Sequence, residues 1–75
     1  MTGEQLRRLR EAGHISMREL ASALRRASVH TIWRHEAGEE RVIEAAEADV
    51  LKRAVIGLLQ ARLAAVAEIL EEIHK

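Results

Sequence analysis

The sequence predicts an all-α fold, in which a compact helix-turn-helix domain of short helices is followed by a long amphipathic C-terminal helix. Three observations support this. The 75 residues include no proline, only four glycines and 48% hydrophobic residues, a composition typical of helical proteins. Serine or threonine residues with the spacing of helix N-caps occur three times in the first forty residues. After about residue 44, apolar residues recur at helical spacing without a proline to interrupt them.

The first short helix is bounded by a start signal and a stop signal. Thr2 and Gln5 have the spacing of a capping box, in which the Thr2 hydroxyl accepts from a helical N–H and Gln5 reaches back. Leu6 and Leu9 are expected to lie on the inner side of the helix. Gly13 is expected to end it as a C-cap with a positive φ.

Two further short helices follow. A second capping box over residues 16–19 starts the second helix, and residues 25–27 form the turn after it. Ser28 is the expected N-cap of the third helix, which runs from residue 29 to about 37 and stops at Gly38. The apolar residues expected to face inward from the second helix are Leu20, Ala21 and Leu24.

The second half is predicted to be one helix over about residues 44–74, or two helices that break near Gly57. Two apolar stripes run along it. One has heptad spacing, which is typical of a coiled-coil seam, and comprises Ile56, Leu59, Leu63, Val66, Leu70 and Ile73. The other comprises Leu51, Val55, Leu58 and Ile69. We expect one stripe to pack on the N-terminal domain and the other to meet a partner helix. The alternative is that both belong to the intramolecular core.

Charge and composition limit the classes of function that the chain can have. Net charge is zero, but residues 1–41 carry eight arginines against six glutamates, whereas residues 42–75 carry four basic and six acidic residues. This mild asymmetry favours a DNA-facing half and a partner-facing half. Trp33 is the single aromatic residue, which argues against a stacking platform for single strands.

The sequence offers no catalytic or metal-binding pattern. Cysteine is absent, and His30 and His35 are five residues apart, a spacing that does not place both on one helical face. Gly13 and Gly38 are isolated helix stops, so no glycine-rich phosphate loop is present. We therefore expect a protein that is not an enzyme and that has no cofactor and no metal site.

Two stretches match the two parts of a known motif in order. The first follows the pattern L-R-x-x-x-G-x-S-x-x-x-L-A, with the glycine approximately placed, and the second follows S-x-x-T-I-x-x-x-E-x-G. The matching residues are Leu9, Arg10, Gly13, Ser16, Leu20, Ala21, Ser28, Thr31, Ile32, Glu36 and Gly38. The chain thus resembles the Cro/repressor-type helix-turn-helix family, the lambda-repressor-like domains of phages and bacteria. The resemblance covers about residues 5–42.

This resemblance implies that the third helix reads the major groove of double-stranded DNA. The implied base-reading residues are Val29, His30, Trp33 and Arg34. The implied phosphate contacts are Arg18, Arg25, Arg26, Ser28 and Arg41. For each arginine the alternative is a solvated surface charge. For Trp33 it is a side chain that caps the edge of the core. Ala21 is expected to be small where helices cross, and Ile32 to anchor the third helix in the core.

The chain departs from the family pattern at three places. The turn Leu24-Arg-Arg-Ala-Ser28 is one residue longer than the usual one, and it lacks the glycine that normally takes the left-handed conformation. Met17 stands where relatives often carry a glutamine that touches the DNA backbone. His35 stands where an apolar or aromatic side chain usually packs.

The sequence thus predicts a helix-turn-helix region over residues 1–42 and a dimerisation region over residues 43–75, packed together as one domain. The expected function is that of a transcriptional regulator, a repressor that binds operator DNA as a homodimer. The alternative is a protein-interaction module such as an antitoxin, anti-repressor or co-regulator. No apolar run is long enough to span a bilayer, and we expect a cytoplasmic protein of a bacterial or phage-infected host cell.

Overall fold

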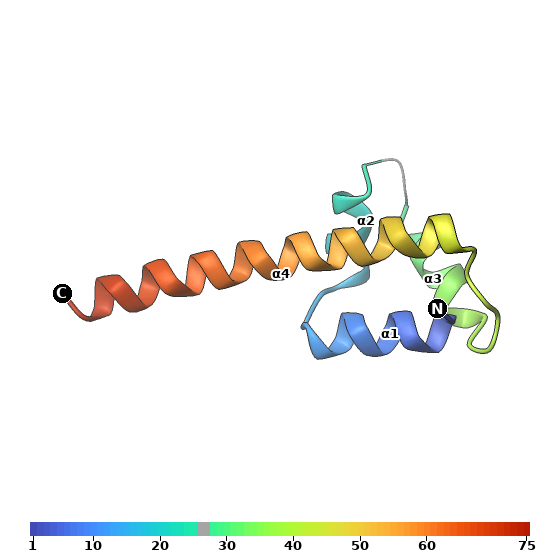
Figure 1. Cartoon of the computed structure of the whole chain (residues 1–75), viewed down its shortest axis with the longest axis horizontal. Helices are drawn as coiled ribbons and strands as arrows, with labels where there is room; N and C mark the ends of the chain where they lie inside the picture. The colour runs from blue at the N-terminus through green and yellow to red at the C-terminus, as the bar shows by residue number, and fades with distance from the viewer. Residues whose placement is uncertain (26–27) are drawn as a thin grey trace.

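The computed structural model describes residues 1–25 and 28–75, and these residues form four helices (Figure 1). Their bounds are α1 Gly3–Ala12, α2 Met17–Ala23, α3 Val29–Ala37 and α4 Ala45–Ile73. The described residues contain no strand beyond one isolated antiparallel bridge between Thr2 and Val42. The all-α prediction is confirmed, with three short helices and a long C-terminal one.

The predicted start signals form the expected hydrogen bonds. The Thr2 hydroxyl accepts from the Gln5 N–H, while the Thr2 N–H donates to Gln5 Oε1 at 2.8 Å. Ser16 and Glu19 make the same reciprocal pair, with both distances at 3.0 Å. At the third helix the Ser28 hydroxyl accepts a hydrogen bond from the Thr31 N–H. Each cap satisfies backbone N–H groups that have no partner within the helix.

The prediction that Gly13 takes a positive φ is wrong. Gly13 has φ −85°, and His14 takes the left-handed conformation instead, with φ 53°. The His14 N–H donates to the Glu11 carbonyl and the Ile15 N–H to the Arg10 carbonyl, which is a Schellman ending one residue later than expected. A Cβ at Gly13 would lie 2.9 Å from Leu59 Cδ2, the end of a side chain that would have to shift.

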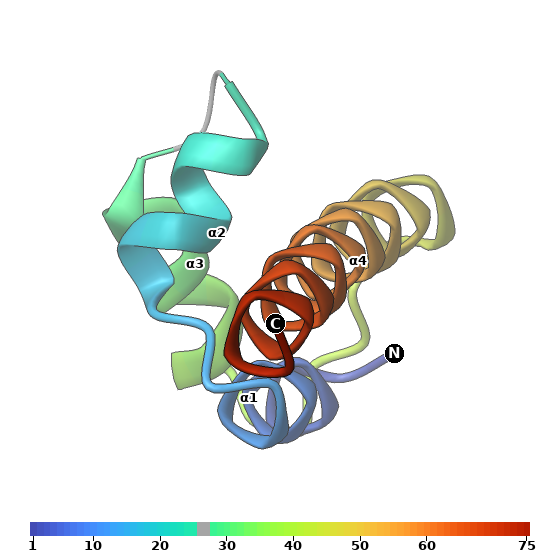
Figure 2. The same cartoon turned by 90° about the vertical axis from the view of Figure 1, so that its left-hand side faces the viewer.

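The helices enclose one core. Figure 2 shows α2 in front of α3, with α4 crossing above α1. α3 packs against both α1 and α2, and α2 also packs against α4. As predicted, Ile32 and Ala21 are buried. The first part of α4 contributes Ala48, Leu51 and Val55 to the same cluster. Regions 1–42 and 43–75 therefore share a core.

Helix α4 is continuous through Gly57, so the alternative of two helices is excluded. A Cβ at Gly57 would meet no atom of another element within 4 Å, so this position lies on an open face of the helix. The C-terminal half of α4 projects beyond the other helices (Figure 1). No helix in the described part of the chain has the length and apolar character needed to cross a membrane.

Candidate nucleic-acid interface

The four predicted base-reading residues share one exposed face of α3. Val29, His30, Trp33 and Arg34 are all exposed, whereas Ile32 and Glu36 are buried. With 3.6 residues per turn, the four exposed positions fall within an arc of about 140° around the helix, so they lie on adjoining parts of its surface. The N-cap Ser28 is also exposed.

Trp33 lies on the surface of α3. Its side chain is 53% exposed, which excludes the alternative that it caps the edge of the core. Its ring stacks on the His30 ring, with centroids 5.6 Å apart and planes inclined by 19°. The stack places two aromatic rings side by side on the exposed surface of α3.

The arginines of the first half divide into two groups. Arg7, Arg8 and Arg10 pair with carboxylates on Glu39, Glu4 and Glu36. The second group makes no ion pair with any residue that the structure describes, and its members are exposed. This group comprises Arg18, Arg25, Arg34 and Arg41. The group is identical to the predicted DNA-contacting arginines within the described residues. Arg26 lies outside those residues.

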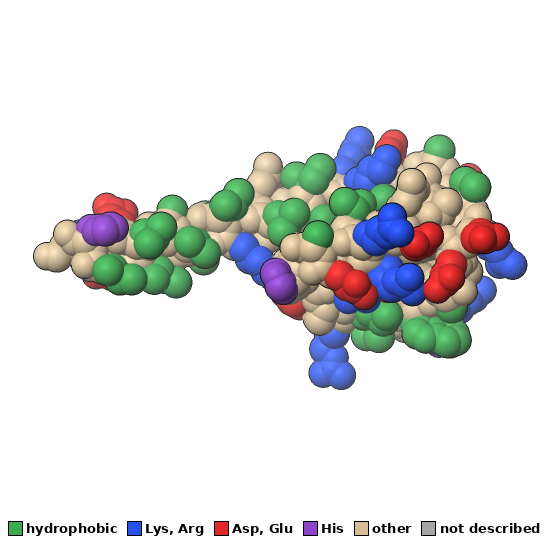
Figure 3. Space-filling model, turned by 90° about the horizontal axis from the view of Figure 1, so that it is seen from below, with side chains coloured by type: hydrophobic (Ala, Val, Ile, Leu, Met, Phe, Trp, Pro, Cys, Tyr) green, Lys and Arg blue, Asp and Glu red, His purple; other side chains and the backbone are tan. Residues whose placement is uncertain are grey.

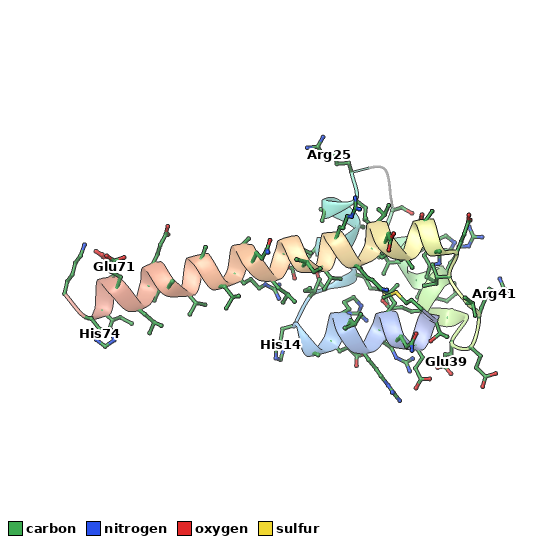
Figure 4. All side chains as sticks on the ribbon, in the orientation of Figure 1. His14, Arg25, Glu39, Arg41, Glu71 and His74 are labelled. Carbon is green, nitrogen blue, oxygen red and sulfur yellow. The ribbon has the colours of Figure 1, made fainter. Side chains whose placement is uncertain are left out.

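Two of these unpaired arginines line a single hollow. Arg34 from α3 and Arg41 from the α3–α4 loop border an open pocket of about 370 Å³, together with Thr31 and Glu44. Arg25 extends away from the body of the molecule after α2, and Arg41 lies at the end opposite the tip of α4 (Figure 4). Arg25 and Arg41 thus lie apart, so the unpaired arginines do not form one cluster.

The α2–α3 turn reaches the left-handed conformation without a glycine. Arg25 has φ 58°, so it takes the backbone conformation for which the family pattern uses glycine. Such a conformation costs a residue with a Cβ about 1 kcal/mol or more. The Arg25 side chain is exposed.

A buried ion pair behind the α3 face was not predicted from the sequence. Arg10 Nε and Nη2 donate to the two carboxylate oxygens of Glu36 at 2.7 and 2.8 Å, and Arg10 Nη1 donates to the Ile15 carbonyl at 3.0 Å. The Glu36 hydrogen bond is the main cause that raises the pKa of Arg10. Glu36 follows Ile32 by four residues, so helical periodicity alone could have placed it on the buried face.

A second unpredicted residue, Arg62 of α4, joins three segments. Its guanidinium donates to the carbonyls of Gly13 and His14, and it pairs with the Glu19 carboxylate on α2. The Ser16 backbone N–H, and after it the Arg62 guanidinium, lower the pKa of Glu19 below its ordinary value. Arg62 thus ties the α1–α2 turn to α4. No local signal in the sequence indicates this contact, because its partners lie more than forty residues away.

The predicted dimer-seam residues of α4 differ in exposure, because only Leu59 packs against the domain. Leu59 is half-buried against the core, so only part of its side chain remains free for a partner. The other five are exposed, and apolar side chains cover much of the projecting end in Figure 3. These five are Ile56, Leu63, Val66, Leu70 and Ile73. Of the second stripe, Leu51, Val55 and Leu58 pack on the domain, whereas Ile69 is exposed.

The exposed seam excludes the alternative that both stripes belong to the intramolecular core. His35 and Met17, where the chain departs from the family pattern, are both half-buried. Met17 packs against the core, and His35 Nε2 lies 3.6 Å from Glu47 Oε1. In the described part of the chain, no three His, Cys, Asp or Glu side chains gather as a metal site would require.

Comparison of the chain with protein-family models, with curated proteins and with solved structures gives no match.

Proposed function

We propose that this chain is a sequence-specific DNA-binding regulator of transcription, a repressor whose helix α3 enters the major groove of operator DNA. The observation that carries the proposal is the division of the arginines. Within the described residues, Arg18, Arg25, Arg34 and Arg41 around α3 have no ion pair, whereas those elsewhere in the first half are paired. Unpaired guanidinium groups are available to phosphates and base edges.

Each face residue has a chemical role in this proposal. Arg34 donates two hydrogen bonds to a guanine edge, and Val29 packs against a thymine methyl group. His30 donates to a purine N7 or a phosphate. Ser28 caps the N-terminus of α3. This end of the helix, which is the positive end of its dipole, faces the DNA backbone. The remaining free arginines contact phosphates, which position the helix without reading sequence.

The proposal includes a homodimer, because one recognition helix covers only a few base pairs. Two half-sites supply the affinity and specificity that one cannot. The exposed seam on α4 is the surface for that dimer. With zero net charge, non-specific attraction to DNA is modest, so affinity depends strongly on pairing. The resemblance favours a protein of the bacterial cytoplasm or of a phage-infected cell.

The test is binding to duplexes selected by the wild-type chain from a random library. Arg34→Ala and His30→Ala together are expected to raise Kd for the selected site about 5- to 150-fold for each side chain that no longer reads a base, equal to about 1–3 kcal/mol. The selectivity over mixed sequence should fall at the same time. Fluorescence anisotropy at a stated salt concentration measures both.

The matched control is Arg53→Ala. Arg53 is an exposed arginine of α4 with no ion pair to a described residue, so its removal changes net charge equally. Its affinity for the selected site should stay close to that of wild type. If the double variant at α3 retains full affinity and selectivity, α3 does not read the DNA and the proposal fails.

A second function is favoured by one observation, the exposed apolar surface of α3. Trp33 is 53% exposed and Val29 41% exposed, and tryptophan is enriched among residues that dominate protein interfaces. In this alternative the helix-turn-helix scaffold binds a protein, as an antitoxin, anti-repressor or co-regulator would. A salt titration separates the two functions. Binding through several phosphates weakens steeply with salt, whereas an apolar contact does not.

A further inference from the structure

We propose that the second copy binds antiparallel, so that the projecting end of each α4 lies along the partner's α4 and ends at the groove between the partner's α1 and α4. This inference rests on the homodimer of the proposed function and adds its orientation and register. Two observations favour this orientation, a groove in the right place and the distribution of charge, and the spacing of the seam residues sets the register.

The groove lies where the projecting end would finish. It has a volume of about 530 Å³ and is lined by Met1, Gln5, Arg8, Leu9 and Lys52. Leu9 is 44% exposed, whereas Leu6 on the same helix is buried. Ile56 follows Lys52 by one turn of α4 and is also exposed, so an apolar path continues from the groove onto the seam.

The seam is symmetric about its centre. Read from both ends, Ile56 is matched by Ile73, Leu59 by Leu70, and Leu63 by Val66. In an antiparallel pair of helices each residue meets the one at the mirrored position, so this register brings large apolar residues together at every level. The partly exposed Leu59 then lies opposite the fully projecting Leu70.

Charge favours the same orientation. The projecting end carries three acidic residues, Glu68, Glu71 and Glu72, which make no ion pair with a described residue, and one basic residue, Lys75. At the groove Arg8 pairs with Glu4, whereas Lys52 makes no ion pair with a described residue. Antiparallel binding separates the acidic ends of the two copies and places Glu72 level with residue 57 of the partner, about 7 Å along the helix from Lys52. Parallel binding would place the acidic end of each copy beside the same end of its partner, where like charges repel.

Disulfide trapping tests the orientation, because the chain contains no cysteine of its own. Full-length Ile56→Cys and Ile73→Cys chains are mixed in equal amounts in a glutathione redox buffer and brought to equilibrium. A mixed disulfide between positions 56 and 73 should predominate in the mass spectrum. Ile56→Cys alone should stay reduced, since antiparallel pairing separates the two copies of position 56 by about 25 Å.

Ala61→Cys mixed with Ile56→Cys is the matched control. Ala61 is an exposed residue of α4, and it should give only background cross-linking. A disulfide between two copies of position 56 would overturn the proposal in favour of a parallel dimer. A chain that sediments as a monomer, or that cross-links no more than the control, would overturn it as well. Because the assay contains no DNA, failure of DNA binding leaves its result unaffected.

Discussion

At the scale of single residues, the packing of this chain depends on close approaches and on one buried charge pair. A Cβ at Gly3 would lie 2.0 Å from the backbone carbonyl oxygen of His35, and one at Gly13 would press on Leu59. Arg10 and Glu36 form a bidentate pair whose side chains are 13% and 4% exposed. These contacts hold α3 against α1 and hold the α1–α2 turn against α4.

We expect Gly3→Ala to destabilise the fold by about 1–3 kcal/mol, because the methyl group would force α1 away from the carbonyl end of α3. The obstacle is main chain and cannot rotate aside. Urea denaturation with a fixed m-value measures the change. A variant as stable as wild type would show that α1 and α3 are further apart than described.

We expect Glu36→Ala to cost about 3–5 kcal/mol, because the Arg10 guanidinium would remain largely buried without its counter-charge. The double variant Arg10→Met with Glu36→Leu should recover most of this loss, since it leaves no charge behind. Thermal and urea unfolding of both variants test the prediction. An equal loss of unfolding free energy in the single and the double variant would contradict the prediction.

At the scale of the elements, α4 is stabilised by its neighbours over its first half and by its own backbone over the second. Gly57 lies between these parts on an exposed surface. Arg62, one turn further along, makes the last polar contacts to the domain through Gly13, His14 and Glu19. The projecting segment beyond it therefore depends on helix propensity or on a partner.

Gly57→Ala should stabilise the chain by about 0.5–1 kcal/mol, because alanine loses less backbone entropy than glycine on entering a helix. The new methyl group meets no atom within 4 Å. This substitution is also the control for Gly3→Ala. The same glycine-to-alanine change is expected to raise the free energy of unfolding where no atom obstructs the new methyl group. Thermal unfolding would detect the rise, and a loss of stability would indicate a contact at this position.

The Glu19 carboxylate should make part of the stability dependent on pH. Its pKa is lowered in the folded chain, first by the Ser16 N–H and then by Arg62. The resulting stabilisation is present above the ordinary glutamate pKa of about 4.3 and is lost as pH falls through the lowered value. We expect Glu19→Gln to reduce the fall in unfolding free energy between neutral and acid pH. An unchanged acid slope would contradict the assignment.

At the scale of the whole molecule, a small core is joined to a long apolar projection. The chain extends 49 Å along its longest axis against 22 and 19 Å along the others. Leu63 is 70% exposed and Ile73 71%. A chain of this size gains little stability from its own core, and pairing the projection with a second copy would add to it by mass action.

Leu63→Asp should therefore convert a dimer into a monomer and lower Tm. In an isolated chain the same substitution would change stability little, because the side chain is exposed. Ala61→Asp is the matched control, since Ala61 lies about 200° away around the helix. Sedimentation and thermal unfolding over a range of concentrations measure both effects. A variant that stays dimeric and equally stable would show that the seam is not the interface.

Local signals determined the helices and their starts. Thr2, Ser16 and Ser28 sit where helices begin because their hydroxyls satisfy the first free N–H groups, whatever the rest of the chain does. Helical periodicity likewise separates buried Ile32 from exposed Trp33. The resemblance to the helix-turn-helix family named Val29, His30 and Arg34 as the proposed interface, and the structure exposes all three on α3.

Tertiary structure decided the contacts between distant segments. The pairing of Arg10 with Glu36 and the bridge from Arg62 to the α1–α2 turn depend on how α3 and α4 lie against the first two helices. The heptad pattern could not show that Leu59 would be half-buried while Leu63 and Ile73 project. Spacing along one helix specifies a face, but only the packing of the other helices determines how far that face is covered.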